Sequence, residues 1–109
     1  MNQRIQIGDI VRHFKYETLR KELKETNTYL YKVLNFAKHT ETGDELVIYQ
    51  ALYTPFAVYA RPYDMFMGKV DKNKYPDIKQ EYRLETVNDP EEVLKISETF
   101  KNMLISEVI

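Results

Sequence analysis

The chain has 109 residues, of which 43% are hydrophobic and 30% charged, and its formal net charge is −1. This size and composition predict one globular domain over residues 1–109, with a core that needs no disulfide or metal. The absence of cysteine excludes disulfides, thiolate metal sites and thiol nucleophiles. Without a long apolar run at the N-terminus or elsewhere, we expect a cytoplasmic protein that neither carries a signal peptide nor spans a membrane.

The first third of the chain predicts two strands separated by a charged insertion. Residues 8–15 are typical of a strand that follows a Gly-Asp turn. Residues 16–28 are rich in Glu and Lys, with pairs spaced four apart, which predicts a short surface helix or an ordered loop. Apolar residues that alternate over 29–39 predict the second strand.

A tight hairpin is expected next, because residues 40–44 form a short polar connection. Gly43 can supply the positive φ that such loops require. The third strand, over residues 45–53, is apolar on both faces, and this pattern predicts a central strand.

The following elements are shorter. We expect a strand at 57–60, a single helical turn at 62–66, a further short strand at 67–71, and a last strand or extended arm at 82–87. A helix from about 90 to 107 is predicted by Asp89 as its cap and by apolar residues at helical spacing. These are Val93, Ile96, Phe100, Leu104 and Val108.

Several chemistries are excluded by the residues present. The three glycines are isolated, so there is neither a P-loop nor a dinucleotide fingerprint, and we expect no cofactor. The weak catalytic candidates are His13 and His39 as general bases, with Glu41 or Glu45 assisting. His39 and Glu41 have the H-x-E spacing of zinc deaminases, but the cysteine half of that site is absent, which excludes such a site. His13, His39 and a carboxylate such as Glu41 or Glu45 are a conceivable ligand set, but the two histidines lack a recognised metal-ligand spacing, so we expect no metal.

Five polar residues are the candidate ligand-binding site: Arg12, His13, Gln50, Tyr53 and Arg61. If their strands are neighbours, these side chains converge at one end of a small barrel and form a concavity that binds an anion. The alternative is structural, with Arg61 paired to Asp64 or Glu45.

The nine tyrosines raise the question of nucleic-acid binding, since aromatic residues on a sheet stack on single strands. Most of them lie among apolar strand residues, which favours core packing. The acidic C-terminal helix and the absence of a basic surplus also argue against a nucleic-acid partner.

The chain resembles a family of short bacterial and phage proteins catalogued as a domain of unknown function, with the pattern RHFKG, YxVL, A(R/K)HTETGEELVVYQALY and VRPxxMF. The matching runs are RHFK at 12–15, YKVL at 31–34, AKHTETG at 37–43, ELVIYQALY at 45–53, RP at 61–62 and MF at 65–66. The resemblance covers about residues 10–70 and implies a mainly β fold, an SH3-like barrel of five or six strands, without implying an activity. The insertion at 16–28 replaces the family's glycine turn, and Ala60 replaces its valine.

Together these observations predict a barrel core over about 8–71, an extended arm over 72–88 and a C-terminal helix over 89–109. The leading functional hypothesis is a non-enzymatic module that binds an anionic ligand, a nucleotide or a protein partner. The alternatives are an interaction protein that dimerises through residues 89–109 and a small His-dependent hydrolase or lyase.

Overall fold

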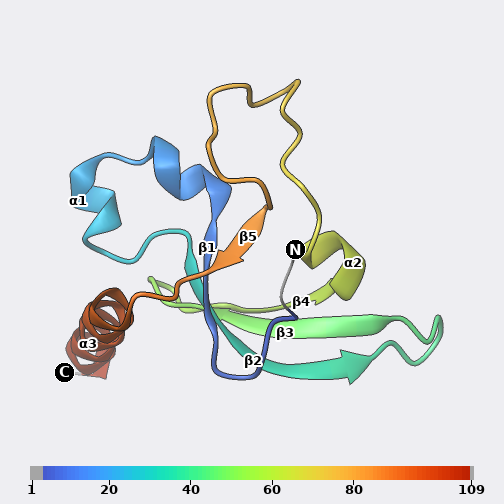
Figure 1. The fold of residues 1–109 in the computed structure, drawn as a ribbon. Helices are drawn as coiled ribbons and strands as arrows, with labels where there is room; N and C mark the ends of the chain where they lie inside the picture. Colours follow the sequence, from blue (N-terminus) through green and yellow to red (C-terminus); the bar gives the residue numbers. More distant parts are fainter. Residues whose placement is uncertain (1–3, 109) are drawn as a thin grey trace.

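The computed structural model describes residues 4–108 and has an α+β fold, in which one antiparallel sheet is flanked by a C-terminal helix (Figure 1). The five strands of the sheet have the order β4-β3-β2-β1-β5. They are β1 (Ile10–His13), β2 (Leu30–Lys38), β3 (Glu45–Ala51), β4 (Val58–Pro62) and β5 (Leu84–Thr86). The helices are the 3-10 helix η1 (Phe14–Thr18), α1 (Lys21–Lys24), α2 (Tyr63–Phe66) and α3 (Pro90–Val108).

The sheet is open, so the closed SH3-like barrel expected from the resemblance is wrong. Its two edges are β4 and β5, and they do not pair with each other. Closure fails because β5 is three residues long and pairs with β1 alone, while α2 begins directly after β4 and turns the chain away. Figure 1 shows β1 and β5 running across the direction of β3 and β4.

A bend in β2 accounts for this change of direction. The register between β2 and β3 shifts between Val33 and Asn35, which is the signature of a β-bulge. Beyond the shift Phe36 pairs with Val47 and packs on the same core as Val33, although strict alternation predicts the opposite face.

The predicted hairpin and its central strand are confirmed. β3 lies between β2 and β4, and Gly43 in the hairpin loop has a φ of 75°. Only one face of β3 is fully buried: Val47 and Ala51 are in the core, whereas Leu46 and Ile48 on the other face are half-buried.

The predicted strand at 67–71 is wrong, whereas the last strand and the helical turn are confirmed. Residues 67–71 make only an isolated bridge, between Lys69 and Tyr82. The chain then reaches β5, whose Leu84 pairs with His13 of β1. The segment expected to be an extended arm therefore contributes a strand to the sheet.

The segment between β1 and β2 forms η1 and α1, and it docks on the C-terminal helix. The short helix α1 is one of the two alternatives that the charge pattern left open. Asn27 is the buried residue that joins the segment to α3, because its Nδ2 donates to the Ile96 carbonyl oxygen at 3.0 Å. Asn27 and Tyr29 both have positive φ, of 62° and 67°, at the turn that leads into β2.

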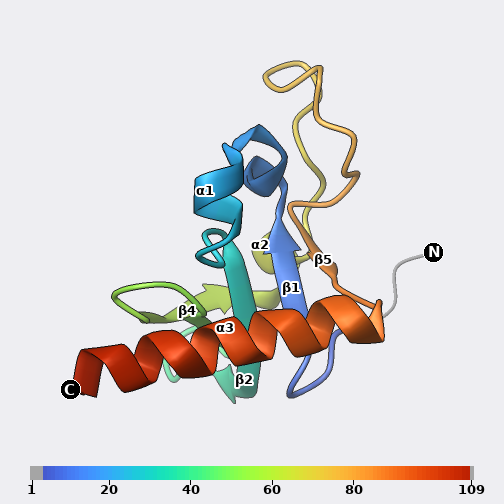
Figure 2. The ribbon, with the colours of Figure 1, turned by 90° about the vertical axis from the view of Figure 1, so that its left-hand side faces the viewer.

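The helix α3 lies across one face of β1 and β2 (Figure 2). Its residues Val93, Ile96 and Phe100 pack on a cluster that includes Ile10 and Leu30. Arg12 of β1 forms an ion pair with Glu92, which attaches the start of the helix to the sheet. Within residues 4–108, no helix combines the length and the apolarity that a bilayer crossing requires.

The opposite face of the sheet carries the main core, which α2 covers. Phe66 of α2 is fully buried and meets the Tyr49 ring at 5.0 Å. We expect Phe66→Ala to lower the free energy of unfolding by about 3–5 kcal/mol, because it removes a large buried ring. Urea denaturation monitored by circular dichroism measures the change.

The neighbouring Met65 provides the control, since it lies on the same short helix and is 49% exposed. Met65→Ala should change the free energy of unfolding by less than about 0.5 kcal/mol. Equal losses for the two variants would contradict the assignment of Phe66 to the core.

Candidate functional site

A hollow of about 310 Å³, which we call the basic hollow, opens on the same face as the main core. It is lined by one carboxylate, one imidazole, two aromatic rings and four cationic side chains. The imidazole is that of His13, and the cationic residues are Lys15, Arg61, Lys74 and Arg83.

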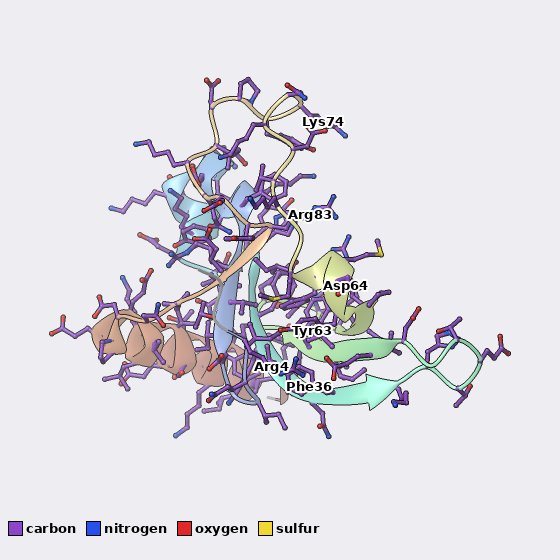
Figure 3. All side chains as sticks on the ribbon, turned by 45° about the vertical axis from the view of Figure 1, so that its right-hand side comes forward. Arg4, Phe36, Tyr63, Asp64, Lys74 and Arg83 are labelled. Carbon is purple, nitrogen blue, oxygen red and sulfur yellow. The ribbon has the colours of Figure 1, made fainter. Side chains whose placement is uncertain are left out.

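Separate elements bring these residues together. His13 ends β1 and pairs with Leu84 of the core, and Arg61 of β4 lies opposite Val47. Arg83 immediately precedes β5, and Lys74 belongs to the loop between α2 and β5. Figure 3 shows Lys74 and Arg83 on one side of the molecule, with Arg4, Phe36 and Tyr63 lower on that side.

His13 is held rigidly beside the hollow. Its ring stacks on Phe14 with the centroids 4.4 Å apart, and its Nδ1 accepts a hydrogen bond from the Lys15 backbone N–H at 3.1 Å. Burial, followed by the charges of Lys15, Arg61 and Arg83, lowers the pKa of His13 from 6.5 to about 4. The imidazole is therefore neutral at pH 7, and the nearby cations disfavour its protonation.

The cations of the hollow lack acidic partners. Within residues 4–108, none of the four forms an ion pair. The carboxylate in the lining, Asp71, already accepts the backbone N–H groups of Asn73 and Lys74 through Oδ1, at 3.0 and 3.4 Å. The hollow thus gathers donors whose natural partner is an anion from outside.

Two of the five predicted binding residues, His13 and Arg61, line this hollow, and two others lie on the opposite face. Arg12 is engaged with Glu92 of α3, and its guanidinium lies over the Tyr16 ring at 4.8 Å. Gln50 donates from Nε2 to the Phe56 carbonyl oxygen at 3.2 Å, which stabilises the connection between β3 and β4.

The fifth predicted residue, Tyr53, does not line the hollow and belongs to a tyrosine cluster on the main core. Its hydroxyl hydrogen-bonds to that of Tyr31 at 2.8 Å. Burial raises the pKa values of Tyr31, Tyr49 and Tyr53. Tyrosine hydroxyls are protonated at neutral pH, and the raised pKa values move ionisation further from it. In the Tyr31–Tyr53 pair one hydroxyl donates and the other accepts.

The catalytic candidates His39 and Glu41 lie in the hairpin loop, remote from His13. His39 follows β2, whereas His13 contacts Tyr29 just before it, so the nine residues of β2 separate them. This is roughly 30 Å along a strand that rises about 3.3 Å per residue. The His39 Nδ1 accepts the Glu41 backbone N–H at 3.1 Å. No three potential metal ligands gather among the described residues.

A larger hollow, of about 530 Å³, lies between α1 and α3. Its lining mixes Lys21, Lys24 and Lys95 with four acidic residues, which are Glu25, Asp89, Glu91 and Glu92. Because the acids balance the lysines, this hollow offers an anion no surplus of positive charge. The smaller basic hollow is therefore the better candidate.

Sequence reasoning missed Lys15, Lys74 and Arg83. Lys74 and Arg83 reach the hollow from the long loop before β5, whose path no local pattern predicts. Gly68 gives no signal for Arg83, because a Cβ there would lie at an ordinary contact distance of 3.8 Å from the Arg83 Nε. The tight contact of such a Cβ would be with the Met65 carbonyl oxygen, at 3.3 Å.

Comparison with known proteins yields a family but no activity. A family model described as "Protein of unknown function (DUF1653)" matches residues 9–86, well over half of the chain. The match continues past residue 70, where the sequence resemblance was expected to end, and contains β5 and the whole basic hollow. No curated protein and no solved structure matches the chain. The chain therefore belongs to the DUF1653 family, a family of proteins of unknown function.

Proposed function

We propose that this chain is a non-enzymatic module that binds an anionic ligand, such as a phosphate-bearing molecule, at the basic hollow. The observation that carries the proposal is the group of four cationic side chains around a single carboxylate. Guanidinium groups suit phosphates and carboxylates because they donate two parallel hydrogen bonds, and the hollow holds two of them, Arg61 and Arg83.

The surroundings of the histidines support binding over catalysis. In the described part of the chain, no carboxylate hydrogen-bonds to His13 or His39, and each uses Nδ1 to cap a turn. A general base is usually oriented by such a partner, as in catalytic triads. The four cations of the hollow, which form no ion pair within residues 4–108, are hydrogen-bond donors, and donors of this kind recognise anions.

We expect Arg83→Gln to weaken the binding of inorganic tripolyphosphate by about tenfold or more, because one charge-assisted hydrogen bond contributes roughly 1.5–3 kcal/mol. Isothermal titration calorimetry measures the affinity.

Arg20→Gln is the matched control, since Arg20 is exposed just before α1 and does not line the hollow. This control should bind tripolyphosphate like the wild type. Equal weakening in both variants would show that affinity depends on the net charge of the protein and not on the hollow. If the wild type does not bind tripolyphosphate, the proposal is refuted.

A second candidate function is self-association through α3, and one observation favours it. The C-terminal half of α3 extends beyond the sheet (Figure 2). Leu104 and Ile105 on this half are 37% and 49% exposed, so they offer apolar surface to a second copy.

Sedimentation velocity tests this candidate. The expected result is a wild-type dimer that Leu104→Glu converts to a monomer, because a carboxylate would be buried at the contact. Ser97→Glu is the control, since Ser97 is exposed on the same helix and should leave the dimer intact. A monomeric wild type would overturn this candidate.

A further inference from the structure

Three tyrosines near the basic hollow form a group that we call the tyrosine shelf, although none of them lines the hollow itself: Tyr29, Tyr53 and Tyr59. The His13 ring lies 5.5 Å from the Tyr29 ring, which in turn is 6.4 Å from Tyr53. On the other side of the hollow, Arg61 interacts with Tyr49, whose ring lies 5.5 Å from Tyr59. The shelf therefore contacts the lining of the hollow directly at His13, through Tyr29, and is linked to Arg61 only through the buried Tyr49 ring.

The shelf rings are accessible and are supported from below. Tyr59 is 44% exposed, and Tyr29 and Tyr53 are half-buried. The buried Tyr31 ring meets Tyr53 and Tyr59 edge-on, at interplanar angles of 73° in both cases. Edge-to-face support fixes the two rings while leaving aromatic surface open to a ligand.

The backbone at Tyr29 adopts a conformation that is unfavourable for tyrosine. Its φ of 67° lies in the left-handed region, which costs a residue with a Cβ roughly 1–2 kcal/mol. Asn or Gly would fit this position better, yet a tyrosine ring occupies it next to His13. Strain of this kind gathers at ligand sites, where it persists because the surrounding structure holds it.

The size of the hollow limits what enters it. At about 310 Å³ it lies at the lower end of ligand pockets, which span roughly 300–1,000 Å³. A charged group fits among the four cations, and the rest of a larger ligand must lie outside. The tyrosine shelf contacts the lining of the hollow at His13, through Tyr29.

We infer that the anion bound in the basic hollow is a backbone phosphate of a single-stranded nucleic acid whose bases stack on the tyrosine shelf. This inference rests on the proposed function and names the ligand class. Proteins that bind single strands combine cations that contact the phosphate backbone with aromatic rings on which any base can stack. The overall net charge of −1 restricts the electrostatic attraction to this one region.

An acidic peptide is the competing ligand, and the pattern of charge and rings favours the nucleic acid. Each nucleotide pairs one phosphate with one flat base, and the hollow combines four cations with links to tyrosine rings at the neutral His13 and at Arg61. A run of acidic side chains would use the cations and leave the three shelf rings without partners.

The test is fluorescence anisotropy with a labelled short oligothymidylate, a strand without stable secondary structure. We expect wild-type binding that weakens as salt rises, with a slope of log K against log salt of about −2 to −3 for four cations. Tyr59→Leu should weaken oligothymidylate binding about tenfold, because it removes one stacking face. The same variant should bind tripolyphosphate like the wild type.

Tyr82→Leu is the matched control, because Tyr82 is half-buried beside Lys69 and away from the shelf. It should bind oligothymidylate with wild-type affinity. Tyr29→Asn is the second variant, since asparagine tolerates the positive φ. It should lose oligothymidylate affinity while its thermal midpoint stays near that of the wild type, a combination that a purely structural tyrosine would not give.

The outcomes separate the inference from the proposed function. If tripolyphosphate binds but oligothymidylate does not, or if poly-glutamate competes equally and the shelf variants have no effect, the inference is overturned and the anion site stands. If neither tripolyphosphate nor oligothymidylate binds, both fail.

Discussion

The bend of β2 is the constraint on which the rest of the structure depends. The first half of this strand lies between β1 and β3, and after the register shift beyond Val33 it pairs with β3 alone. A bulge strengthens the local twist, so β1 and β5 cross the direction of β3 and β4. This crossing brings the end of β1 near β4, which places His13 and Arg61 on one hollow. A straight β2 would separate them.

The fold holds the four cationic side chains of the basic hollow close together, although like charges repel one another. Burial, followed by the charges of Lys15, Arg61 and Arg83, lowers the pKa of His13. Because the folded-state pKa, about 4, lies below the unfolded value of 6.5, the unfolded chain binds the extra proton between these pH values. His13 therefore contributes stability that is present above pH 6.5 and is lost as the pH falls toward 4. A bound anion reduces the repulsion between the cations of the hollow, and this reduction contributes to the free energy of ligand binding.

Local patterns predicted much of the fold, including the hairpin with Gly43, the charged insertion, the turn at α2 and the C-terminal helix, because each depends on neighbouring residues. The open sheet depends on the short β5 and on α2 directly after β4, and no local pattern predicts that these two features keep the sheet from closing. The altered face of Phe36 depends on one bulge, which is not apparent from the alternation of β2. The predicted cluster also joined Arg12 to His13, although consecutive residues of a strand point to opposite faces. Lys74 and Arg83 come from a long loop whose course is set by tertiary packing, so their place in the hollow required the structure.

The pKa of His13, followed by NMR with and without sulfate, tests the central claim most directly. Sulfate keeps its charge across the titration, so a change in the His13 pKa cannot come from protonation of the ligand. The free protein should titrate at a pKa of about 4, and saturating sulfate should raise this value because the anion offsets Lys15, Arg61 and Arg83. By linkage, sulfate then binds more tightly as the pH falls. A His13 pKa near 6.5 in the free protein, or one that sulfate leaves unchanged, would contradict an anion site at the basic hollow.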